Sequence, residues 1–219
     1  MGRSRSRRNK RLVIPVVIAL ATLFVSYRFV EQVGRDKPIG DRFGVVSVYD
    51  GDTAELQGGD KLRLLGIDTP EAGEPYHDEA KQMLARLAVS QSCRIEYGGK
   101  RRDKYGRLLG YLYVDTCFVN RAIVASGLAY VYLFDDSDLK QREISELISA
   151  QRSAIEGKRG LWGLPREREA FYVNTVGSFR LHRPSCPSIG PLREGRSHKY
   201  ATREEGMLEG LSPCRTCKP

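Results

Sequence analysis

The pattern of apolar and polar positions predicts a chain built from short strands and amphipathic helices. Short apolar or alternating runs, typical of half-buried strands, occupy residues 43–49, 53–56, 62–67, 94–97 and 107–114. Apolar residues then recur at i, i+3, i+4, i+7 and i+8 from Ala80 to Ala88, which predicts a helix whose stripe is core packing rather than a cofactor motif. Further helices are predicted over 119–127 and 138–156. Without a parallel-sheet rhythm, these elements predict a small antiparallel β-barrel packed on helices, an α+β architecture.

The second and third strand runs have the pattern of a tight hairpin. Asp50-Gly51 is a turn signal at its start, and residues 57–60 (QGGD) supply the reversal between the two runs. A hairpin returns its ends to each other. We therefore expect Asp52, at the start, and Asp68, at the end, to be neighbours in space.

Three carboxylates of this stretch (Asp52, Asp68 and Glu71) and its one guanidinium, Arg63, are candidates for chemistry. Clustered carboxylates raise each other's pKa unless a cation lies between them, and oxygen ligands from Asp52 and Asp68 suit a hard cation, Ca²⁺ or Mg²⁺. Arg63 presents a planar fork of donors that suits a phosphate, and Glu71 follows Asp68 closely enough to orient or deprotonate a water. Two interpretations follow from the residues: metal-assisted hydrolysis of a phosphodiester, or a polar hairpin with solvated acids.

Four motifs resemble those of the staphylococcal nuclease family, and they occur in that family's order. The motifs are residues 50–53 (DGDT), 63–71 (RLLGIDTPE), 103–113 (DKYGRLLGYLY) and the block 119–124 (VNRAIV) with 127–129 (GLA). The similarity extends from about residue 44 to about residue 165. It implies a five-stranded OB-fold nuclease domain over residues 43–166.

The resemblance also implies catalytic roles. The implied calcium ligands are the side chains of Asp52 and Asp68 and the backbone carbonyl of Thr69. Arg63 and Arg107 are implied to hold the scissile phosphate, with Glu71 acting on the attacking water as general base or by orienting it. The implied reaction is hydrolysis of DNA or RNA with little sequence preference, leaving a 5′-hydroxyl and a 3′-phosphate. The segment 72–78 departs from the family pattern, because it is shorter than the founding member's loop.

Substrate contacts are implied for the open face of the barrel. Tyr105 matches a tyrosine that the family places beside the nucleotide, and Tyr132 is the candidate for a second one, with Tyr130 as the alternative. Lys104 and Asp50 are expected to support binding and catalysis. Such a face suits single-stranded nucleic acid, since bases stack on aromatic rings while basic groups follow the backbone. No organic cofactor is expected. The alternative function is a catalytically inactive scaffold that binds nucleic acid or peptide.

The first 34 residues differ in character from the rest. Six basic residues precede an apolar run at residues 12–27 (LVIPVVIALATLFVSY), so that residues 12–30 predict an uncleaved signal anchor or an export signal. The basic cluster predicts that the body of the protein lies on the extracytoplasmic side, and cleavage near Ala21 would make it a secreted protein. Residues 35–42 form a predicted linker. Six of the nine net positive charges belong to this terminus, so nucleic-acid binding by the folded part depends on local arginines.

Residues 171–219 contain three of the five cysteines and two of the three histidines. The spacing predicts a zinc site with the ligands His182, Cys186, Cys214 and Cys217. A segment this short, with few large apolar residues, needs an additional stabilising link, which a bound metal supplies. We predict a hairpin over 171–181 and a small helix capped by Thr202, with Glu205 completing a capping box. The tail resembles zinc modules of the Ada type, with a histidine in place of one cysteine.

Three alternatives concern the cysteines and the nitrogen ligand. His198 is the alternative nitrogen ligand for zinc. In an oxidising compartment, Cys214 and Cys217, or either of them with Cys186, could pair as a disulfide instead. The other two cysteines, Cys93 and Cys117, are expected on facing ends of one hairpin. There they either form a disulfide or serve as small buried apolar side chains.

Overall fold

The computed structural model of this protein describes residues 42–134, 138–192 and 195–219. The predicted signal or anchor at 12–30 lies outside these residues, as does almost all of the predicted linker. Within the described part, no helix has the length and apolar character needed to cross a bilayer. All of the described residues belong to one compact unit, residues 40–219.

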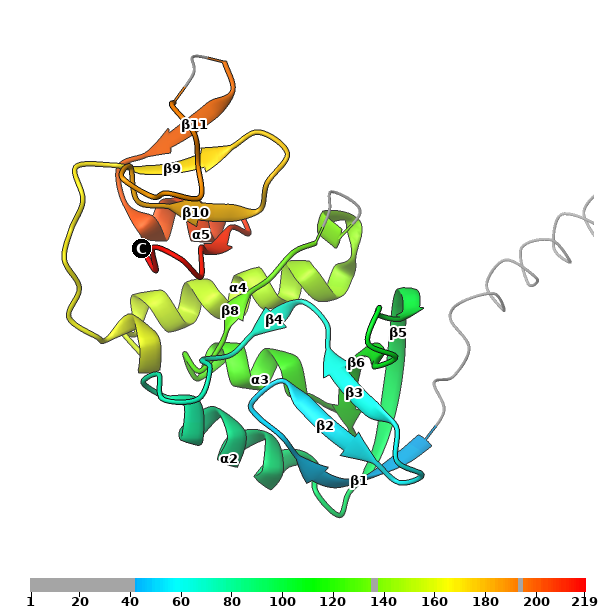
Figure 1. The fold of residues 1–219 in the computed structure, drawn as a ribbon. Helices are drawn as coiled ribbons and strands as arrows, with labels where there is room; N and C mark the ends of the chain where they lie inside the picture. The colour runs from blue at the N-terminus through cyan, green and yellow to red at the C-terminus, as the bar shows by residue number, and fades with distance from the viewer. Residues whose placement is uncertain (1–41, 135–137, 193–194) are drawn as a thin grey trace, which may run out of the picture. The chain divides into compact units, whose positions relative to one another are not determined.

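Five strands close into a barrel (Figure 1). They are β1 (Arg42–Val48), β2 (Thr53–Leu56), β3 (Lys61–Leu64), β5 (Ser92–Arg102) and β6 (Leu108–Val114). Their order is β3-β2-β1-β5-β6, and a parallel pairing between β3 and β6, in which Arg63 faces Leu109, closes the ring. Because closure removes exposed sheet edges, these short strands form a stable shell. The predicted five-stranded barrel is confirmed.

The strand predicted over 62–67 was wrong in one respect, since the structure breaks it into β3 and a separate strand β4 (Ile67–Asp68). Gly66 lies between them with a φ of 74°, a left-handed conformation that glycine adopts without strain. A Cβ at Gly66 would lie 2.6 Å from a methyl of Leu147. The turn directs β4 out of the barrel to pair with β8 (Tyr130–Val131) in an antiparallel ladder. Asp68 is thereby placed at the barrel's rim.

Three helices and two 3₁₀ turns accompany the barrel. They are α2 (His77–Ala88), α3 (Val119–Ala125), the turn Asp138–Lys140, α4 (Arg142–Glu156) and the turn Gly160–Trp162. A two-residue strand, β7 (Cys117–Phe118), pairs with β6 and leads into α3. The helix predicted over 138–156 therefore begins with a separate 3₁₀ turn. In α2, the predicted stripe faces the core, with Ala80, Leu84 and Ala88 buried.

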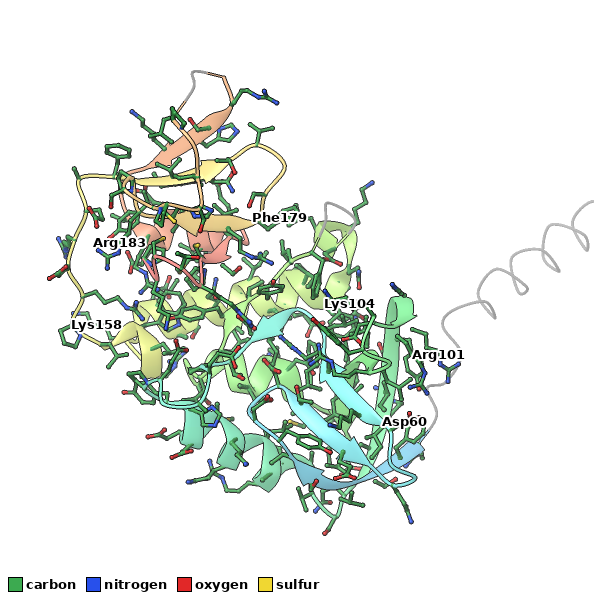
Figure 2. All side chains as sticks on the ribbon, viewed as in Figure 1. Asp60, Arg101, Lys104, Lys158, Phe179 and Arg183 are labelled. Atoms are coloured by element: carbon green, nitrogen blue, oxygen red, sulfur yellow. The ribbon has the colours of Figure 1, made fainter. Side chains whose placement is uncertain are left out.

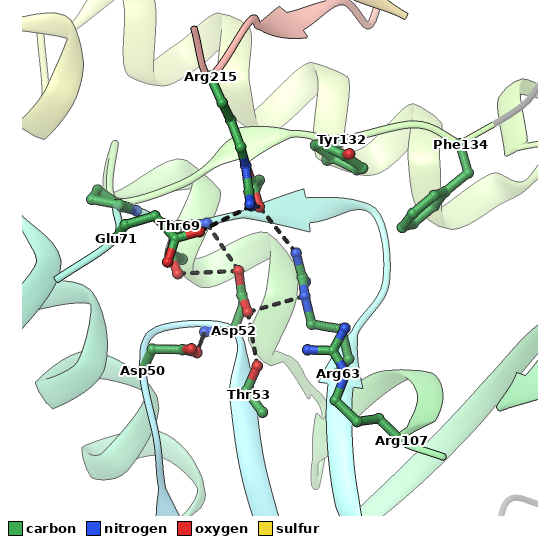
Figure 3. A pocket seen from close by; sticks show the side chains of 12 residues that line it. Asp50, Asp52, Thr53, Arg63, Thr69, Glu71, Arg107, Tyr132, Phe134 and Arg215 are labelled. Carbon is green, nitrogen blue, oxygen red and sulfur yellow. Dashed lines mark hydrogen bonds and ion pairs between the residues drawn. The ribbon is translucent and has the colours of Figure 1, made fainter. Parts of the chain in front are cut away.

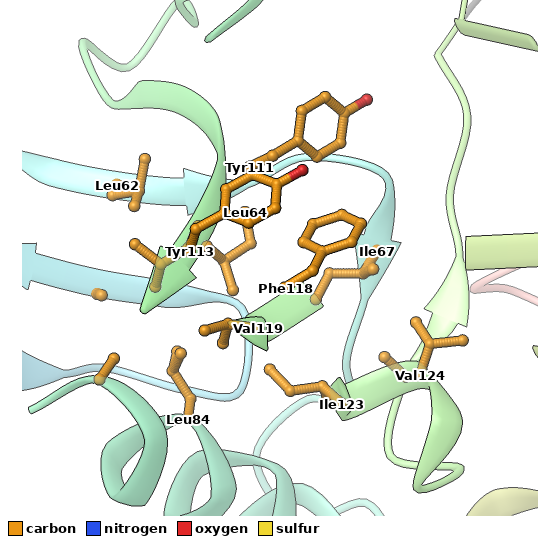
Figure 4. Close-up of a cluster of buried hydrophobic side chains, with 14 of the residues drawn as sticks. Leu62, Leu64, Ile67, Leu84, Tyr111, Tyr113, Phe118, Val119, Ile123 and Val124 are labelled. Atoms are coloured by element: carbon orange, nitrogen blue, oxygen red, sulfur yellow. The ribbon is translucent and has the colours of Figure 1, made fainter. Parts of the chain in front are cut away.

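The main core lies between the barrel and helices α2, α3 and α4 (Figure 4). Its aromatic members pack closely: Tyr113 stacks on Phe118 with ring centroids 4.8 Å apart, and Tyr111 meets Phe118 edge-on at 5.9 Å. One buried polar side chain crosses this core. The Asn120 amide accepts a hydrogen bond from the Leu112 amide (3.0 Å) and donates one to the Leu65 carbonyl (2.8 Å), which ties α3 to β6 and to the turn after β3.

Replacing Asn120 with alanine is expected to lower the free energy of unfolding by about 2–4 kcal/mol. The side chain is 0% exposed, and its removal leaves one buried backbone donor and one buried acceptor without partners, at a cost of about 1–3 kcal/mol each. Urea denaturation followed by circular dichroism measures the change. Gln91→Ala, at an exposed position, is the control. Equal denaturation midpoints for the two variants would contradict the assignment.

The C-terminal residues form a second, smaller sheet with one helix. The elements are β9 (Tyr172–Thr175), β10 (Arg180–His182), β11 (Ser197–Tyr200), α5 (Arg203–Leu208) and β12 (Ser212–Pro213), in the sheet order β11-β9-β10-β12. The predicted hairpin is β9–β10, and the predicted capping box is confirmed: Glu205 N donates to Thr202 Oγ1 (3.2 Å) and Thr202 N donates to Glu205 Oε2 (3.3 Å). We call residues 171–219 the C-terminal module.

The C-terminal module packs against the barrel and its helices through α4. Its apolar cluster has only four buried members, Tyr172, Leu181, Met207 and Leu211. Phe179 (labelled in Figure 2) packs against both this cluster and the main core. Gln151 of α4 donates to the Met207 carbonyl (2.7 Å), and Arg180 donates to the Leu133 carbonyl (3.1 Å). These contacts hold the module close to α4 and to the segment that follows β8.

Candidate active site

A polar cavity of about 340 Å³ opens at the rim of the barrel (Figure 3). The residues to which the resemblance assigns metal binding or catalysis all line it: Asp52, Arg63, Asp68, Thr69, Glu71 and Arg107. Asp52 immediately precedes β2, Arg63 lies within β3 and Asp68 ends β4. Thr69 and Glu71 belong to the loop that follows β4, and Arg107 immediately precedes β6. The expected convergence of the hairpin ends is therefore present in the structure.

Arg63 lies at the centre of the acidic group. Its Nε is 3.1 Å from Asp52 Oδ1 and its Nη2 is 3.1 Å from Asp68 Oδ1, while Nη1 donates to the carbonyls of Leu64 and Ile67. The side chain is only 11% exposed. Arg63 is thus fixed by two carboxylates and two carbonyls, and one guanidinium contacts both Asp52 and Asp68.

Asp52 is oriented by the residues around it. Its Oδ2 accepts hydrogen bonds from the backbone N (3.0 Å) and hydroxyl (3.1 Å) of Thr69, and its Oδ1 accepts from the Thr53 hydroxyl (3.0 Å). The turn before β2 needs Gly51, because a Cβ there would lie 2.5 Å from the Ala80 side chain and 2.8 Å from Thr69. Glycine therefore allows the loop with Asp52 to approach Thr69 closely.

Burial makes this acidic cluster electrostatically costly. Burial and the adjacent charge of Asp52 raise the pKa of Asp50, whose Oδ1 accepts a hydrogen bond from the Asp52 amide (3.0 Å). Burial also raises the pKa of Asp68, although Arg63 and Arg215 oppose the shift. The raised pKa values mean that the nearby guanidiniums do not fully offset the cost of burying these negative charges. A bound cation would relieve this cost, and an oxygen-rich site favours a hard one.

Arg107 is held from one side only. Its Nε donates to Asp103 Oδ2 (2.8 Å), and Asp103 Oδ1 accepts from the amides of Arg107 and Tyr105. Although burial opposes the shift, these hydrogen bonds hold the pKa of Asp103 below its ordinary value. Among the described residues, no hydrogen-bond acceptor contacts the two Nη groups of Arg107, which line the cavity beside Arg63 (Figure 3). These donors remain available to a ligand.

Glu71 lies in an exposed loop at the mouth of the cavity. Its backbone N donates to Glu74 Oε2 (2.9 Å), and its side chain is 62% exposed. The loop is short, because α2 already begins at His77, whose Nδ1 lies 2.8 Å from the Pro70 carbonyl. This loop fixes the backbone of Glu71 but supplies no partner for its carboxylate.

Aromatic side chains surround the cavity. Tyr132 lines it, packs edge-on against Phe134 (centroids 5.0 Å apart) and is covered by the Arg180 guanidinium at 3.7 Å. Tyr130, the alternative, instead packs against Trp162 and bonds to Arg166. Residues two apart in a regular strand share a face, but β8 ends at Val131, so Tyr132 lies beyond the regular strand and joins a different cluster from Tyr130.

The other substrate-contact residues lie at the tip before β6. Tyr105 is 72% exposed, with Lys104 Nζ 5.0 Å and the Arg107 guanidinium 5.6 Å from its ring centroid. Figure 2 shows Lys104 at this side of the barrel. Neither Tyr105 nor Lys104 lines the cavity itself. They provide an exposed aromatic and basic surface next to Arg107.

Two cavity residues were missed from the sequence. Phe134 follows the pattern Tyr130, Tyr132, Phe134, an alternation that could have indicated an aromatic edge. Arg215 comes from the C-terminal module, where its position between Cys214 and Cys217 gave no sign of a role at the barrel. Its Nη2 lies 2.9 Å from Asp68 Oδ1 and 3.1 Å from Glu71 Oε1.

The residues predicted as zinc ligands converge in the C-terminal module. The ligand atoms of His182, Cys186, Cys214 and Cys217 all lie within 4.8 Å of one another. His182 Nδ1 is 3.4 Å from Cys186 Sγ, and Cys186 Sγ is 4.0 Å from Cys214 Sγ. Ligands of a tetrahedral zinc ion, at bond lengths of roughly 2.0–2.3 Å, lie about 3.5–3.8 Å apart. His198, the alternative nitrogen, is exposed on β11 and is not a member of this cluster.

The protonation of this cluster is consistent with a metal site. Burial and the nearby charge of Arg180 lower the pKa of His182, which favours the neutral imidazole that a metal requires. Burial raises the pKa of Cys217 to about 12. For Cys214, burial acts in the same direction, but hydrogen bonds from the amides of Cys217 and Thr216 outweigh it and lower the pKa. A divalent cation would stabilise the thiolates together.

The five cysteines are all free thiols. The expectation that Cys93 and Cys117 lie on facing strand ends was wrong, because Val114 of β6 pairs with Cys93 on one side and with Cys117 on the other. The two cysteines are therefore two strands apart, roughly 9–10 Å, which exceeds the Cα separation of about 7 Å that a disulfide allows. Burial raises the pKa of Cys93 to about 11.

The fold and the cavity together define a class of protein: a closed barrel of the OB type with carboxylates and arginines gathered at its rim. The sequence comparisons identify the family. The model described as "Staphylococcal nuclease homologue" matches residues 61–163. An uncharacterized endonuclease of Escherichia coli O157:H7 is 36% identical over 122 residues, which are 54% of this chain and 74% of the relative. The chain belongs to the staphylococcal nuclease family.

Two further relatives extend the comparison. The thermonuclease of Staphylococcus hyicus is 29% identical over 169 residues, which are 70% of this chain and 98% of that protein. The micrococcal nuclease of Shigella flexneri is 28% identical over 139 residues, which are 58% of this chain and 76% of the relative. The family match ends at residue 163, before the C-terminal module begins.

Proposed function

We propose that this protein is a Ca²⁺-dependent nuclease that hydrolyses phosphodiester bonds of DNA or RNA with little sequence preference and leaves 5′-hydroxyl and 3′-phosphate ends. The observation that carries the proposal is the gathering of Asp52, Asp68, Arg63, Arg107 and Glu71 around one cavity. Family membership supports nuclease chemistry, since the relatives are nucleases by name. The alternative of an inactive binding scaffold would not require this complete set of acids and arginines.

The donors in the cavity fit a hard cation. Asp52 and Asp68 both present carboxylate oxygens at Arg63, and a positive ion would lower the cost of burying the charged form of Asp68, whose pKa burial raises. We assign Asp52, Asp68 and the Thr69 carbonyl as the calcium ligands. Bound there, the ion would supply Lewis-acid polarisation of the phosphate and lower the pKa of a coordinated water.

The protein's own residues then have distinct tasks. Arg107 offers its two Nη groups to the phosphate beside Arg63, and together the two guanidiniums stabilise the charge that gathers on the phosphoryl oxygens. Glu71 orients the attacking water or accepts its proton, in line with the leaving oxygen. Tyr132 and Tyr105 offer stacking surfaces for the bases on either side of the cleaved bond, and Lys104 contributes a phosphate contact.

Cleavage of single-stranded DNA by the purified chain is expected with Ca²⁺ and is expected to stop when EGTA removes the ion. Gel electrophoresis of a 5′-labelled oligonucleotide measures the rate, and sensitivity of the product to a 3′-phosphatase identifies its end. Mg²⁺ in place of Ca²⁺ is the control for the metal. Tight binding of the oligonucleotide without cleavage in any metal would support the scaffold alternative and contradict the enzyme.

We further propose that the C-terminal module binds one structural Zn²⁺ through His182, Cys186, Cys214 and Cys217. The convergence of these four atoms and the neutral state of His182 support the proposal. The module would then resemble an Ada-type unit in which a histidine replaces one cysteine. A bound metal would explain how a segment with so small an apolar cluster folds.

The N-terminal residues bear on where the nuclease acts. We propose that residues 12–30 anchor the chain in the membrane and that the nuclease domain lies on the extracytoplasmic side. Cleavage near Ala21 would release it as a secreted protein. Cell fractionation, followed by N-terminal sequencing of the mature chain, distinguishes these two outcomes.

A further inference from the structure

The loop between the last two cysteines of the metal-binding cluster reaches the catalytic cavity. Arg215, between Cys214 and Cys217, extends toward the barrel, where its Nη2 contacts both Asp68 (2.9 Å) and Glu71 (3.1 Å) (Figure 3). Asp68 and Arg215 are 147 positions apart in the sequence. The contact therefore joins two regions that neither the family match nor a local motif connects.

This loop is tied down on both sides. On the module side, Cys214 N donates to the Leu181 carbonyl (2.9 Å), while Arg183 donates to the Cys217 carbonyl (3.0 Å) through its side chain and to Cys217 Sγ (3.3 Å) through its backbone N. On the barrel side, the Lys218 ammonium pairs with Glu74, in the loop that carries Glu71. Two cations of the module thus meet two acids of the catalytic loop. The position of Arg215 depends on the fold of the metal-binding loop.

Glu71 has no other support for its carboxylate. Among the described residues, the only hydrogen-bonding or ionic partner of the Glu71 carboxylate is Arg215. The backbone bond to Glu74 fixes the loop but leaves the exposed side chain free to rotate. A general base that is misplaced by about 1 Å can lose about a hundredfold in rate. An arginine that restrains this carboxylate therefore has a direct effect on catalysis.

We propose that Arg215 is a positioning residue for Glu71 and that the C-terminal module, once its metal-binding loop is ordered, completes the nuclease site. This inference rests on the proposed function. Arg215 compensates for the short loop after Glu71, which offers no partner of its own. The opposite role, in which the guanidinium blocks the cation by occupying Asp68, predicts the reverse result in the same experiment.

Arg215→Ala is expected to lower kcat by about 10- to 100-fold on single-stranded DNA at saturating Ca²⁺, with KM changed less than about threefold. Arg215→Lys is expected to recover part of the loss, because an ammonium can still reach one carboxylate. The control is Arg196→Ala, at an exposed position of the same module. Zinc content and thermal midpoint are measured for each variant, and both are expected to match the parent, because an exposed ion pair contributes little to stability.

A double-mutant cycle separates positioning from a general structural effect. If Arg215 acts through Glu71, the double variant Arg215→Ala/Glu71→Gln has the same kcat as Glu71→Gln alone. Removal of zinc by a zinc-selective chelator, with Ca²⁺ in excess, is expected to reduce kcat of the parent as much as Arg215→Ala does, and to change that variant no further.

The outcomes separate this inference from the proposed function. A parent that cleaves no substrate overturns the proposed function and this inference with it. A parent that cleaves DNA while Arg215→Ala keeps or exceeds its kcat overturns only the inference, as does additive behaviour in the double-mutant cycle.

Discussion

Replacing Arg107 with alanine is expected to lower kcat for DNA cleavage by about a thousandfold or more, comparable to the loss of an arginine that stabilises the transition state in other phosphoryl-transfer enzymes. Arg63 is enclosed by two carboxylates and two carbonyls, whereas Arg107, among the residues that the structure describes, has a side-chain hydrogen bond only from Nε to Asp103 and keeps its Nη groups toward the cavity. Arg107 therefore has more donor capacity left for the phosphate. Single-turnover cleavage at saturating Ca²⁺ measures the effect.

A control for this experiment is available on the same hairpin. Arg102 pairs with Asp60 at the surface, through two hydrogen bonds of 2.9 Å, and does not line the cavity. Arg102→Ala is expected to keep kcat within about twofold, since an exposed ion pair has little energetic effect. Arg107→Lys is expected to remain strongly impaired, because an ammonium cannot form the bidentate contact. An Arg107→Ala enzyme with the parent's kcat would remove Arg107 from the catalytic group.

Cys214→Ser is expected to abolish zinc binding and to unfold most of the C-terminal module while the barrel stays folded. Structural zinc sites contribute an apparent free energy of about 10–16 kcal/mol in small domains, and an apolar cluster with four buried members cannot replace it here. Cys214 Sγ also lies 4.0 Å from Cys186 Sγ, within the cluster. Hydrogen exchange measured by mass spectrometry is expected to show loss of protection in β9–β12 and α5 alone.

The barrel supplies the matching cysteine control. Cys117 is a free, partly exposed thiol on β7, outside the metal-binding cluster. Cys117→Ser is expected to retain one zinc per chain and the parent's exchange pattern in the module. Full protection of β9–β12 in zinc-free Cys214→Ser would show that the sheet and its packing on α4 are sufficient without metal.

Features encoded over short distances could be read from the sequence. The DG and QGGD turns form the β2–β3 hairpin that begins after Asp52, and the turn at Gly66 then brings Asp68 back beside it, so their proximity is encoded within one short stretch. The capping box at Thr202 and Glu205 is equally local. The four zinc-ligand candidates belong to this group as well, because each pair is defined by its own short spacing and only the meeting of the two pairs requires the fold.

Other features depended on how distant segments pack. Closure of the barrel required β3 to pair with β6. This parallel pairing is not predicted by any turn motif, because no short turn connects the two strands. The position of Gly66 against α4 split an apolar run that looked continuous. Cys93 and Cys117 were separated by an intervening strand, which changed a possible bridge into two isolated thiols.

The sequence by itself determined the barrel, the acids and arginines of its rim, and the histidine and three cysteines that cluster in the C-terminal module, because short-range periodicity, turns and spacing encode them. Only the tertiary structure decided that Arg215 of the module lies beside Glu71, and that Tyr132 rather than Tyr130 faces the cavity. Such contacts arise when two separately formed units pack together. Docking depends on the shapes and charges of whole surfaces, which no local stretch of sequence specifies.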